Sequence, residues 1–259
     1  MDFLDRAAEA PALLLATDFD GTLSEIVPTP EAARAAPGAL EALAALARAP
    51  GVTVAVVSGR SLVDLVRLTP GLEAAWRVGE HGAQIAEPGG ALVHDLDPPT
   101  SALDDLERTS EAMATVHPGL RVERKRAAVA VHWRAVSPEL RPPVLTALAR
   151  WTEEAERAGF SVIHGRSVYE ARCPGLDKAA ALALILSRLP SGALPVYAGD
   201  DTTDESAIAL AGQRGGVGVY IASAERPSAA AEADLVLDEP SRWVTLLAEL
   251  ASRRQGKAV

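Results

Sequence analysis

Cysteine is almost absent from this 259-residue chain, which contains a single one, Cys173. One thiol excludes a disulfide framework within the chain and a metal cluster held by several thiolates, and it is compatible with a reducing compartment. The chain also lacks a run of about 18 apolar residues, the length that a membrane-spanning helix requires. Acidic Asp2, Asp5 and Glu9 stand where a signal peptide carries positive charge, so we expect a cytoplasmic protein.

Positively charged residues are in the minority. The 25 lysines and arginines face 35 aspartates and glutamates, which gives a formal net charge of -10. A field of this sign repels phosphate backbones and anionic membranes, so we expect neither nucleic acid nor a membrane as a partner. Apolar residues make up 48% of the chain, enough for one large core or for a main domain with a smaller one. The sequence specifies no oligomer, and a monomer is compatible with it.

One structural unit recurs towards both ends of the chain. An apolar run of strand length ends in a polar or glycine-rich turn, and a helical pattern follows. The strand-like runs are ALLLATD ending at Asp18, GVTVAVVS at Ser58, AAWRVGE at Glu80 and ALPVYAGD at Asp200. The helical patterns cover residues 37–49, 61–68, 177–189 and 204–211. Near-continuous apolar strands that alternate with helices predict an α/β fold with a parallel sheet covered on both faces.

The middle of the chain follows a different pattern. Residues 94–100 are interpreted as a linker, after which the order is helix, strand, strand, helix, strand, strand. RVERK with AVAVHWR, and FSVI with SVYEAR, predict two hairpins, which would not extend a parallel sheet. We therefore expect a small α+β domain over residues 98–173, inserted into a core formed by residues 1–97 and 174–259.

Polar side chains follow the predicted strands at their carboxyl ends, where open α/β sheets bind ligands. Asp18, Ser58 and Asp200 each follow a strand directly, and Lys178 opens a helix. The same edge of the sheet collects five carboxylates: Asp18, Asp20, Asp200, Asp201 and Asp204. Such a set cannot share one pocket in ionised form without a cation, and ligands that are all oxygen suit Mg²⁺. The sequence therefore predicts Mg²⁺ as a cofactor.

The positions of these groups predict phosphoryl transfer through a covalent intermediate. Asp18 can attack phosphorus and form an aspartyl-phosphate, while Asp20 can protonate the leaving oxygen and then activate water. The carbonyl of Asp20 and the carboxylate of Asp200 fit the metal; Asp201 and Asp204 would act through a water, or Asp204 would orient the lysine. Donors for the phosphate oxygens are expected from Thr22, Ser58, Lys178 and the N–H groups of the turn 18–22.

Each of these motifs also has a structural explanation when it is taken alone. A D-x-D turn is common, Ser58 could cap a helix, and the cluster GDDTTDE could cap another, since acids favour helix N-termini. Lysines such as Lys178 are most often solvated. The combined order of acid pair, serine, lysine and acid cluster, each behind a strand or opening a helix, favours a functional site. His81, in the turn GEHG, could also approach it.

The motifs DFDGT, SGR, Lys178 and GDDTTDE are similar to the four motifs of the haloacid-dehalogenase (HAD) superfamily of phosphatases. Within it, the chain resembles the trehalose-6-phosphate phosphatase family from about residue 12 to about residue 250. The segments that carry this narrower resemblance are DFDGTLSEIVPTP, VVSGR, VGEHG, VERKRAAVAVHWR, VIHGRSVYEAR and GDDTTDESA. The resemblance implies a HAD-like Rossmannoid core with a parallel sheet, a small inserted α+β cap domain of the C2 type, and Mg²⁺-dependent hydrolysis of trehalose 6-phosphate.

The resemblance also implies roles for individual residues. It places the nucleophile on Asp18, the acid/base on Asp20, and the metal ligands on Asp18, the Asp20 carbonyl and Asp200. Phosphate contacts fall on Ser58, Gly59, Arg60 and Lys178. Sugar contacts of the cap fall on Glu123, Lys125, Arg134 and Glu170, with Arg166 a weaker candidate. The chain departs from the usual family residues at Cys173, Ala179 and Ile208, where proline, glycine and an aromatic residue are usual.

The charged residues of the inserted domain have two explanations. Strand alternation puts Glu123 and Lys125 on one face with Arg121, and Glu170 on one face with Arg172. Such a face can simply be solvated, which is the simpler explanation for Arg121 and Arg172. It could instead bind the hydroxyl groups of a sugar, which accept from basic groups and donate to carboxylates.

Other functions remain open at this point. Another HAD sugar phosphatase could act on sucrose 6-phosphate or mannosyl-3-phosphoglycerate, and a phosphomutase is a more distant alternative. A non-catalytic sugar-phosphate sensor could also be built on the same fold. The complete set of Asp18, Asp20, Lys178 and Asp200 favours an enzyme, because a sensor would be expected to have lost at least one of them.

Overall fold

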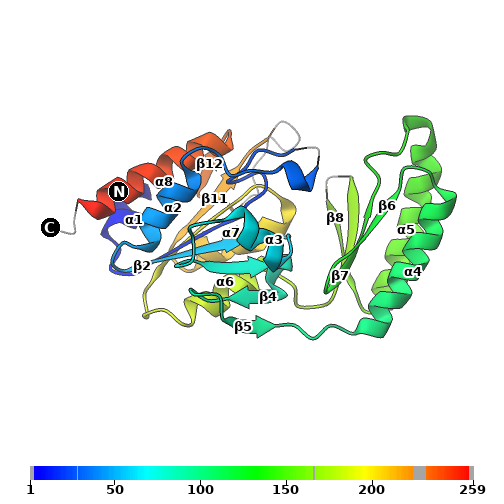
Figure 1. Ribbon diagram of the computed structural model, residues 1–259, viewed down its shortest axis with the longest axis horizontal. Coiled ribbons are helices and arrows are strands. Elements are labelled where there is room, and N and C mark those ends of the chain that lie inside the picture. Colours follow the sequence, from blue (N-terminus) through cyan, green and yellow to red (C-terminus); the bar gives the residue numbers. More distant parts are fainter. Residues whose placement is uncertain (1–2, 28, 166, 224–231, 257–259) are drawn as a thin grey trace. The chain divides into compact units, whose positions relative to one another are not determined.

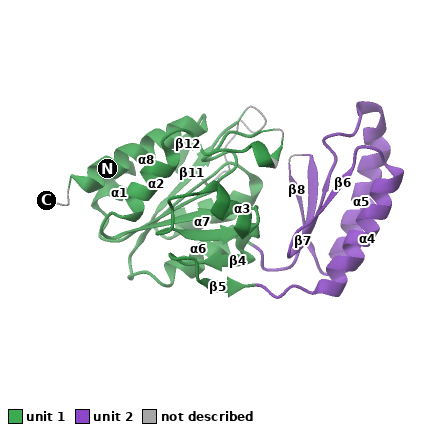
Figure 2. Cartoon of the chain, in the orientation of Figure 1, with its two compact units in different colours: residues 1–95, 177–259 green, residues 96–176 purple. Residues whose placement is uncertain are grey.

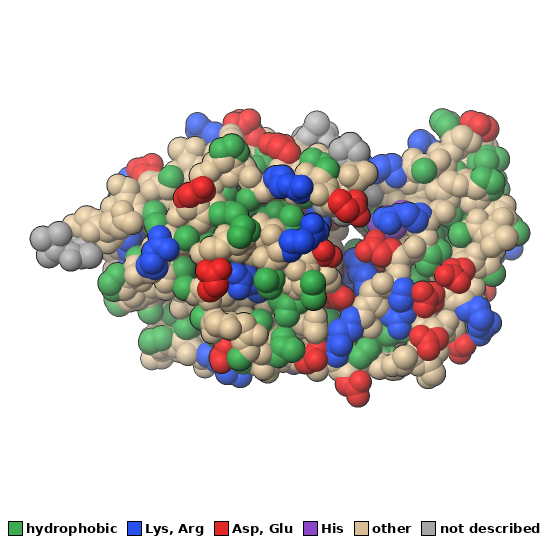
Figure 3. Space-filling view, in the orientation of Figure 1, with side chains coloured by type: hydrophobic (Ala, Val, Ile, Leu, Met, Phe, Trp, Pro, Cys, Tyr) green, Lys and Arg blue, Asp and Glu red, His purple; other side chains and the backbone are tan. Residues whose placement is uncertain are grey.

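The structure is a computed structural model that describes residues 3–27, 29–165, 167–223 and 232–256. Its contacts divide the chain into two compact units (Figure 2): unit 1 comprises residues 1–95 and 177–259, and unit 2 comprises residues 96–176. The sequence places these boundaries at 97/98 and 173/174. Among the described residues, no helix is long and apolar enough to cross a membrane. Acidic and basic side chains are interspersed on the face drawn in Figure 3.

Unit 1 is built on an eight-stranded sheet with the order β12-β11-β10-β1-β2-β3-β4-β5 (Figure 1). Its strands are β1 (Leu13–Thr17), β2 (Val52–Val57), β3 (Trp76–Gly79), β4 (Gln84–Ala86), β5 (Leu92–Asp95), β10 (Leu194–Gly199), β11 (Val217–Ile221) and β12 (Leu235–Leu237). The six strands from β12 to β3 pair in parallel, while β4 pairs antiparallel with both β3 and β5. The predicted parallel sheet is confirmed, and the strand that ends at Asp18 lies at its centre.

Two strands at one end of this sheet escape the sequence patterns. The sequence does not predict β4 or β5, and it assigns His94 and Asp95 to a linker, whereas the structure places both residues in the edge strand β5. The reason is that β4 has three residues and β5 has four, all of them exposed or half-buried in β5. Neither strand therefore contains an apolar run.

Helices cover both faces of the sheet in unit 1. One face packs on α1 (Phe3–Glu9), α2 (Ala39–Ala47), α3 (Leu62–Leu68) and α8 (Pro240–Gln255), and the other on α6 (Lys178–Leu186) and α7 (Glu205–Gln213). Along β1, Leu13 and Leu15 point into the first core, and Leu14 and Ala16 into the second. This alternation, buried on both sides, explains why the strand is apolar from Leu13 to Ala16. Short 3-10 turns lie at η1 (Pro30–Ala32), η2 (Glu80–Gly82) and η4 (Thr202–Asp204).

Unit 2 is an antiparallel sheet with helices on one face. The strands β6 (Arg121–Arg124), β7 (Ala128–His132), β8 (Ser161–Gly165) and β9 (Val168–Arg172) are ordered β6-β7-β9-β8. The two predicted hairpins are confirmed as β6–β7 and β8–β9. The helices α4 (Thr100–Val116) and α5 (Arg141–Arg157) pack against this sheet (Figure 1), and η3 (Pro138–Leu140) precedes α5. One face of the sheet is thereby covered by helices, and Arg124 on β6 pairs with Asp104 and Glu107 of α4.

Candidate active site

Asp18 is held at the end of β1 by its own backbone. Its N–H donates to the carbonyl of Ala198 on β10 (2.8 Å), and its side chain is 6% exposed. The chain then turns sharply, because the N–H of Gly21 donates to the Ser24 carbonyl (2.9 Å) and the N–H of Leu23 donates to the Phe19 carbonyl (2.9 Å). The turn is thus closed by its own hydrogen bonds, and it presents Asp18 and the following residues at the carboxyl edge of the sheet.

Lys178 links two of the predicted acids. It is the first residue of α6, and its Nζ donates to Oδ1 of Asp18 (2.8 Å) and to Oδ1 of Asp204 (2.7 Å). The other oxygen of Asp204 accepts from the N–H of Asp201 (3.1 Å), while the Asp201 carboxylate accepts from the N–H of Thr202 (2.8 Å). Of the two roles open to Asp204, the geometry supports the orientation of Lys178.

Tyr197 is a site residue that sequence reasoning missed. Its fully buried hydroxyl donates to Oδ1 of Asp204 (2.6 Å), the same oxygen that accepts from Lys178. In the sequence, Tyr197 is one residue of an apolar strand, and nothing distinguishes it from a core aromatic residue. Its position two residues before the end of β10 is the only signal that could have pointed to it.

Burial and charge shift the pKa values of this cluster in a consistent direction. Burial raises the pKa of Asp18 well above its ordinary range; Lys178 partly offsets this, and the carboxylates of Asp204, Asp200 and Asp20 raise it further. Burial would lower the pKa of Lys178, but attraction to Asp18 and Asp204 outweighs it and raises that pKa. The lysine therefore stays charged. A further cation beside Asp18 would lower its pKa and hold it in the ionised, nucleophilic form.

The acids could hold such a cation. Oxygen atoms of Asp18, Asp200 and Asp204 lie within 4.8 Å of one another, and all three residues are buried. Because Asp204 already accepts three hydrogen bonds, Asp18 and Asp200 are the carboxylates best placed for an ion. Gly21 allows the Asp200 carboxylate to lie close to the turn that follows Asp18. Gly21 has φ of +82°, and a Cβ at this position would collide with that carboxylate. An all-oxygen donor set of this kind fits Mg²⁺.

Two of the predicted phosphate contacts, Ser58 and Gly59, follow the neighbouring strand β2. Ser58 follows β2 directly and is 1% exposed. Gly59 packs against the imidazole of His81, so closely that a Cβ would not fit, and the N–H of His81 donates to the Ser58 carbonyl (3.0 Å). The hydroxyl of Thr22 is buried and has no partner among the described residues. His81 therefore shapes the loop at Ser58 and Gly59.

Arg60 is placed differently from the expectation. Its guanidinium donates to both oxygens of the Asp20 carboxylate, from Nε (2.6 Å) and from Nη2 (2.6 Å). The resemblance assigns Asp20 to proton transfer and Arg60 to phosphate, and these residues are 40 positions apart in the sequence. Their pairing is therefore a finding of the structure alone.

Three of the candidate sugar contacts of unit 2, Glu123, Lys125 and Glu170, lie on the face of its sheet opposite the helices. The register puts Glu123 opposite Ala130 and Ala130 opposite Glu170. Lys125 Nζ donates to Oε2 of Glu170 (3.0 Å), and Arg172 Nε donates to Oε1 of the same carboxylate (2.9 Å). The sequence favours a solvated position for Arg172, but its side chain is 5% exposed and paired, so that interpretation is wrong.

Two further candidates in unit 2 need correction or fall outside the description. The sequence predicts a strand over AVAVHWR that would include Arg134, but β7 ends at His132, and Arg134 lies in the following turn with an exposed side chain. His132 instead contacts Glu123, with 2.8 Å between its Nε2 and Oε2 of the carboxylate. Arg166 lies outside the described residues.

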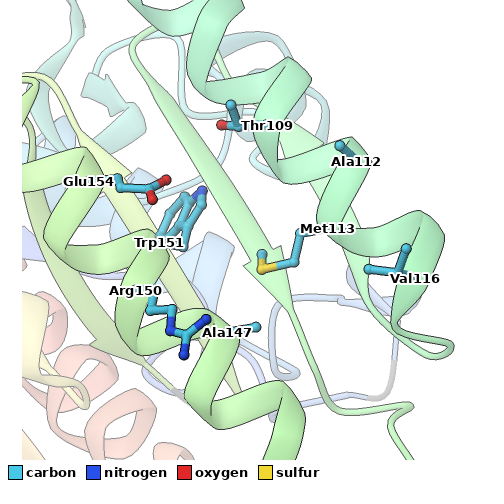
Figure 4. Close-up of a pocket in the computed structure, with 8 residues that line it drawn as sticks. All are labelled: Thr109, Ala112, Met113, Val116, Ala147, Arg150, Trp151 and Glu154. Carbon is cyan, nitrogen blue, oxygen red and sulfur yellow. The ribbon is translucent and has the colours of Figure 1, made fainter.

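Unit 2 also contains a cavity of about 330 Å³ between α4 and α5 (Figure 4). Apolar groups such as Met113 and Val116 form most of its lining. The indole of Trp151 in its wall donates to the hydroxyl of Ser110 (2.8 Å), and Arg150 and Glu154 are one helical turn apart on α5. No nucleophile or acid pair converges there among the described residues, so we assign no chemistry to this cavity.

Comparison with known proteins decides the family. A family model described as Trehalose-phosphatase matches residues 16–241, which is more than half of the chain. The chain belongs to the trehalose-phosphatase family. A trehalose-phosphate phosphatase of Mycobacterium tuberculosis is 38% identical over 254 residues, an alignment that covers 94% of this chain and 62% of that protein. The chain thus spans less than two thirds of the length of this relative.

Solved structures agree on the fold. The C-terminal domain of a Candida albicans trehalose-6-phosphate phosphatase matches with a TM-score of 0.81 at 22% identity, covering 96% of this chain and 95% of that one. The C-terminal domain of a Candida albicans trehalose synthase regulatory protein matches with a TM-score of 0.77 at 16% identity, covering 94% and 96%. A HAD-superfamily phosphatase also matches. The expected HAD-like core with an inserted α+β domain is confirmed, and these distant neighbours show the fold alone.

Proposed function

We propose that this trehalose-phosphatase family member is a Mg²⁺-dependent phosphohydrolase that converts trehalose 6-phosphate to trehalose and phosphate. The observation that carries the proposal is the buried chain of contacts from Asp18 through Lys178 to Asp204, with Asp200 beside it. Burying a charged group costs free energy unless the group pairs with an opposite charge or binds a ligand. In the described structure, Lys178 is the one lysine that contacts Asp18, whereas three other carboxylates raise the pKa of Asp18. The excess of negative charge favours the binding of a further cation, and that cation together with Lys178 would attract an anionic substrate.

The first step uses the groups of the turn after β1. An oxygen of Asp18 attacks phosphorus, a P–O bond to Asp18 forms, and the P–O bond to the sugar breaks. Asp20 gives its proton to the departing sugar oxygen. Lys178 holds the attacking carboxylate in place and offsets the charge of the phosphate oxygens, together with donors from Thr22 and Ser58 and the loop at Gly59.

The second step returns the enzyme to its starting state. Asp20, now ionised, takes a proton from a water molecule that attacks phosphorus, and the P–O bond to Asp18 breaks to release phosphate. Mg²⁺, when bound by Asp18, the Asp20 carbonyl and Asp200, supplies positive charge that stabilises the phosphoryl group in transfer. Asp201 and Asp204 act through other residues. The Asp204 carboxylate accepts from Lys178 and orients it, and the N–H of Asp201 donates to Asp204 and holds that carboxylate in place.

Specificity for the sugar is proposed to lie in unit 2. Glu123, Lys125 and Glu170 share the open face of the sheet, and Arg134 lies in the turn beyond β7. Carboxylates accept hydrogen bonds from sugar hydroxyls and the basic groups donate to them. A sugar that fails to match would leave these charges without partners, which penalises the wrong substrate.

The trehalose synthase regulatory protein among the structural neighbours keeps the sensor alternative relevant, because the two folds agree. The experiment is phosphate release from trehalose 6-phosphate, sucrose 6-phosphate, glucose 6-phosphate and a mannosyl phosphate, each with Mg²⁺ and with EDTA. We expect release from trehalose 6-phosphate above the others, abolished by EDTA. Preference for another sugar phosphate would replace the substrate, and activity on none would favour the sensor.

A further inference from the structure

The ion pair between Arg60 and Asp20 shows which partner holds the other. The Arg60 side chain is 12% exposed and the Asp20 side chain is 40% exposed. The guanidinium carbon also lies 5.7 Å from the centroid of the Phe19 ring, within range of a cation–π contact. Arg60 is therefore the less exposed and better anchored partner, and Asp20 is the more exposed partner that it holds.

The backbone of Arg60 is fixed as well. Its N–H donates to Oγ of Ser58 (3.2 Å), and its carbonyl accepts from the N–H of Glu80 (2.8 Å). The residue thus joins the loop after β2 to the turn after β3 before its side chain reaches the turn after β1. The backbone of Arg60 is held by hydrogen bonds, and its guanidinium lies over the Phe19 ring. Two parallel hydrogen bonds from a guanidinium held in this way fix both the plane and the direction of a carboxylate, which a single hydrogen bond cannot do.

The same donors cannot serve two anions at once. Nε and Nη2 form the edge of the guanidinium that is used for Asp20, and a phosphate bound to that edge would have to displace the carboxylate. The carboxylate, in contrast, has about four lone-pair sites, of which the fork occupies two. Asp20 can therefore remain bound to Arg60 while one of the two other lone pairs carries the proton that it gives to the substrate oxygen.

We infer that Arg60 is a positioning residue whose Nε–Nη2 edge fixes the carboxylate of Asp20 for proton transfer, and that this edge does not bind phosphate. The inference rests on the proposed function, in which Asp20 is the acid/base. It assigns to the arginine of the SGR motif a role that acts through another residue. The consequence is that loss of Arg60 should slow turnover and leave phosphate affinity unchanged.

The test compares Arg60→Met, Arg60→Lys and Ser58→Ala with the wild type on trehalose 6-phosphate. The control is Arg67→Met, an exposed arginine on α3 that contacts Asp64 (3.1 Å). The measurements are kcat, KM, the inhibition constant of inorganic phosphate, and Tm as a check on folding. We expect Arg60→Met to lower kcat by about 100-fold, the scale of general acid–base catalysis, with the phosphate constant unchanged within about 2-fold.

The remaining variants separate the outcomes. Arg60→Lys keeps the charge but not the fork, so it should recover part of kcat, and it carries the test if Arg60→Met fails to fold. Ser58→Ala should raise the phosphate constant, and Arg67→Met should change nothing. A phosphate constant raised about 10-fold or more in Arg60→Met, with kcat preserved, would overturn the inference.

A double-mutant cycle gives an independent check on a small aryl phosphate. If Arg60 acts through Asp20, Arg60→Met should cost little more in an Asp20→Asn background, because the two changes remove one function. Additive losses would overturn the inference. A wild-type chain that releases no phosphate from either substrate contradicts the proposed function itself, whereas an active wild type with additive losses contradicts the inference alone.

Discussion

At the scale of single residues, the candidate active site depends on the absence of a side chain at Gly21. This residue has φ of +82°, and a Cβ there would collide with the Asp200 carboxylate. Gly71 has φ of +81° but nothing within 4 Å of the same position. Gly21→Ala and Gly71→Ala therefore share a backbone strain of about 1–2 kcal/mol, and only the first displaces an acid of the site.

We expect Gly21→Ala to lower kcat/KM for trehalose 6-phosphate by about 100-fold, the loss that a displacement of about 1 Å can cause. Gly71→Ala should lose stability and keep its activity per folded molecule. Steady-state kinetics and thermal unfolding of both variants measure this. Equal activity in the two variants would contradict a role for the close contact between Gly21 and Asp200.

Glu123 gives a prediction about pH. The hydrogen bond from His132 lowers the pKa of Glu123, with burial opposing it and Lys125 adding to the decrease. Because the folded pKa lies below the ordinary value of about 4.3, this carboxylate stabilises the fold above that value, and the contribution is lost as the pH falls through the folded pKa. The effect should be small, since the Glu123 side chain is 38% exposed.

Glu123→Gln removes this titration. Its Tm should lie below that of the wild type near neutral pH, and the difference should shrink as the pH is lowered below about 4.3. Thermal unfolding followed from pH 7 to pH 3, a range of roughly four units around that value, provides the measurement. A difference between the two proteins that stays constant over the range would contradict the link between Glu123 and His132.

The sequence predicts those site residues that directly follow a strand, but it does not predict which side chains of the site contact one another. Asp18, Ser58 and Asp200 each follow an apolar strand, and the rule that ligands bind at strand ends brings them together. The sequence contains no corresponding signal for the fork from Arg60 to Asp20, which depends on rotamers of residues 40 positions apart. Tyr197 was missed because it lies within an apolar strand, where an aromatic residue is expected to belong to the core.

At the scale of secondary-structure elements, opposite charges from the end of β6 and from β9 meet across β7 in unit 2. Glu170 on β9 accepts from Lys125, just beyond β6, and from Arg172 on its own strand. Glu170→Ala would leave two cations without their common partner. We expect KM for trehalose 6-phosphate to rise about 10- to 100-fold, since a group that hydrogen-bonds a substrate in a polar site is worth roughly 1–3 kcal/mol.

The matched control for Glu170→Ala is Glu156→Ala, an exposed position on α5. Both variants should hydrolyse a small aryl phosphate like the wild type, because that substrate has no sugar for unit 2 to bind. Kinetics on the two substrates measure this. Equal losses of Glu170→Ala on both substrates would show that Glu170 supports the structure and does not select the sugar.

The sequence predicts the buried strands with continuous apolar runs, but it does not predict the edge strand β5. The central strands β1, β2 and β10 are buried on both faces, which forces an apolar run into the sequence. The strand β5 is an edge strand with no buried residue, so its sequence, LVHD, resembles a linker. The hairpins of unit 2 were found because each consists of two runs of strand length that lie close together in the sequence.

At the scale of the whole molecule, each unit combines its own core with its own set of charged residues. In unit 1, the parallel sheet brings acids from distant segments of the chain to one edge, and in unit 2 the antiparallel sheet gathers charges on one face. Membership of the trehalose-phosphatase family covers both units, since the match runs from residue 16 to residue 241. The proposed function gives each unit a separate task, phosphoryl transfer in unit 1 and sugar selection in unit 2.

The central claim is that Asp18 is the nucleophile of this chemistry, and the most direct measurement is phosphate release by Asp18→Asn. The wild type and the variant are compared at saturating trehalose 6-phosphate with Mg²⁺, and circular dichroism establishes that both are folded. We predict that the wild type releases phosphate and that Asp18→Asn retains its fold while losing turnover, because the amide cannot form the aspartyl-phosphate. Normal phosphate release by a folded Asp18→Asn variant would contradict the account.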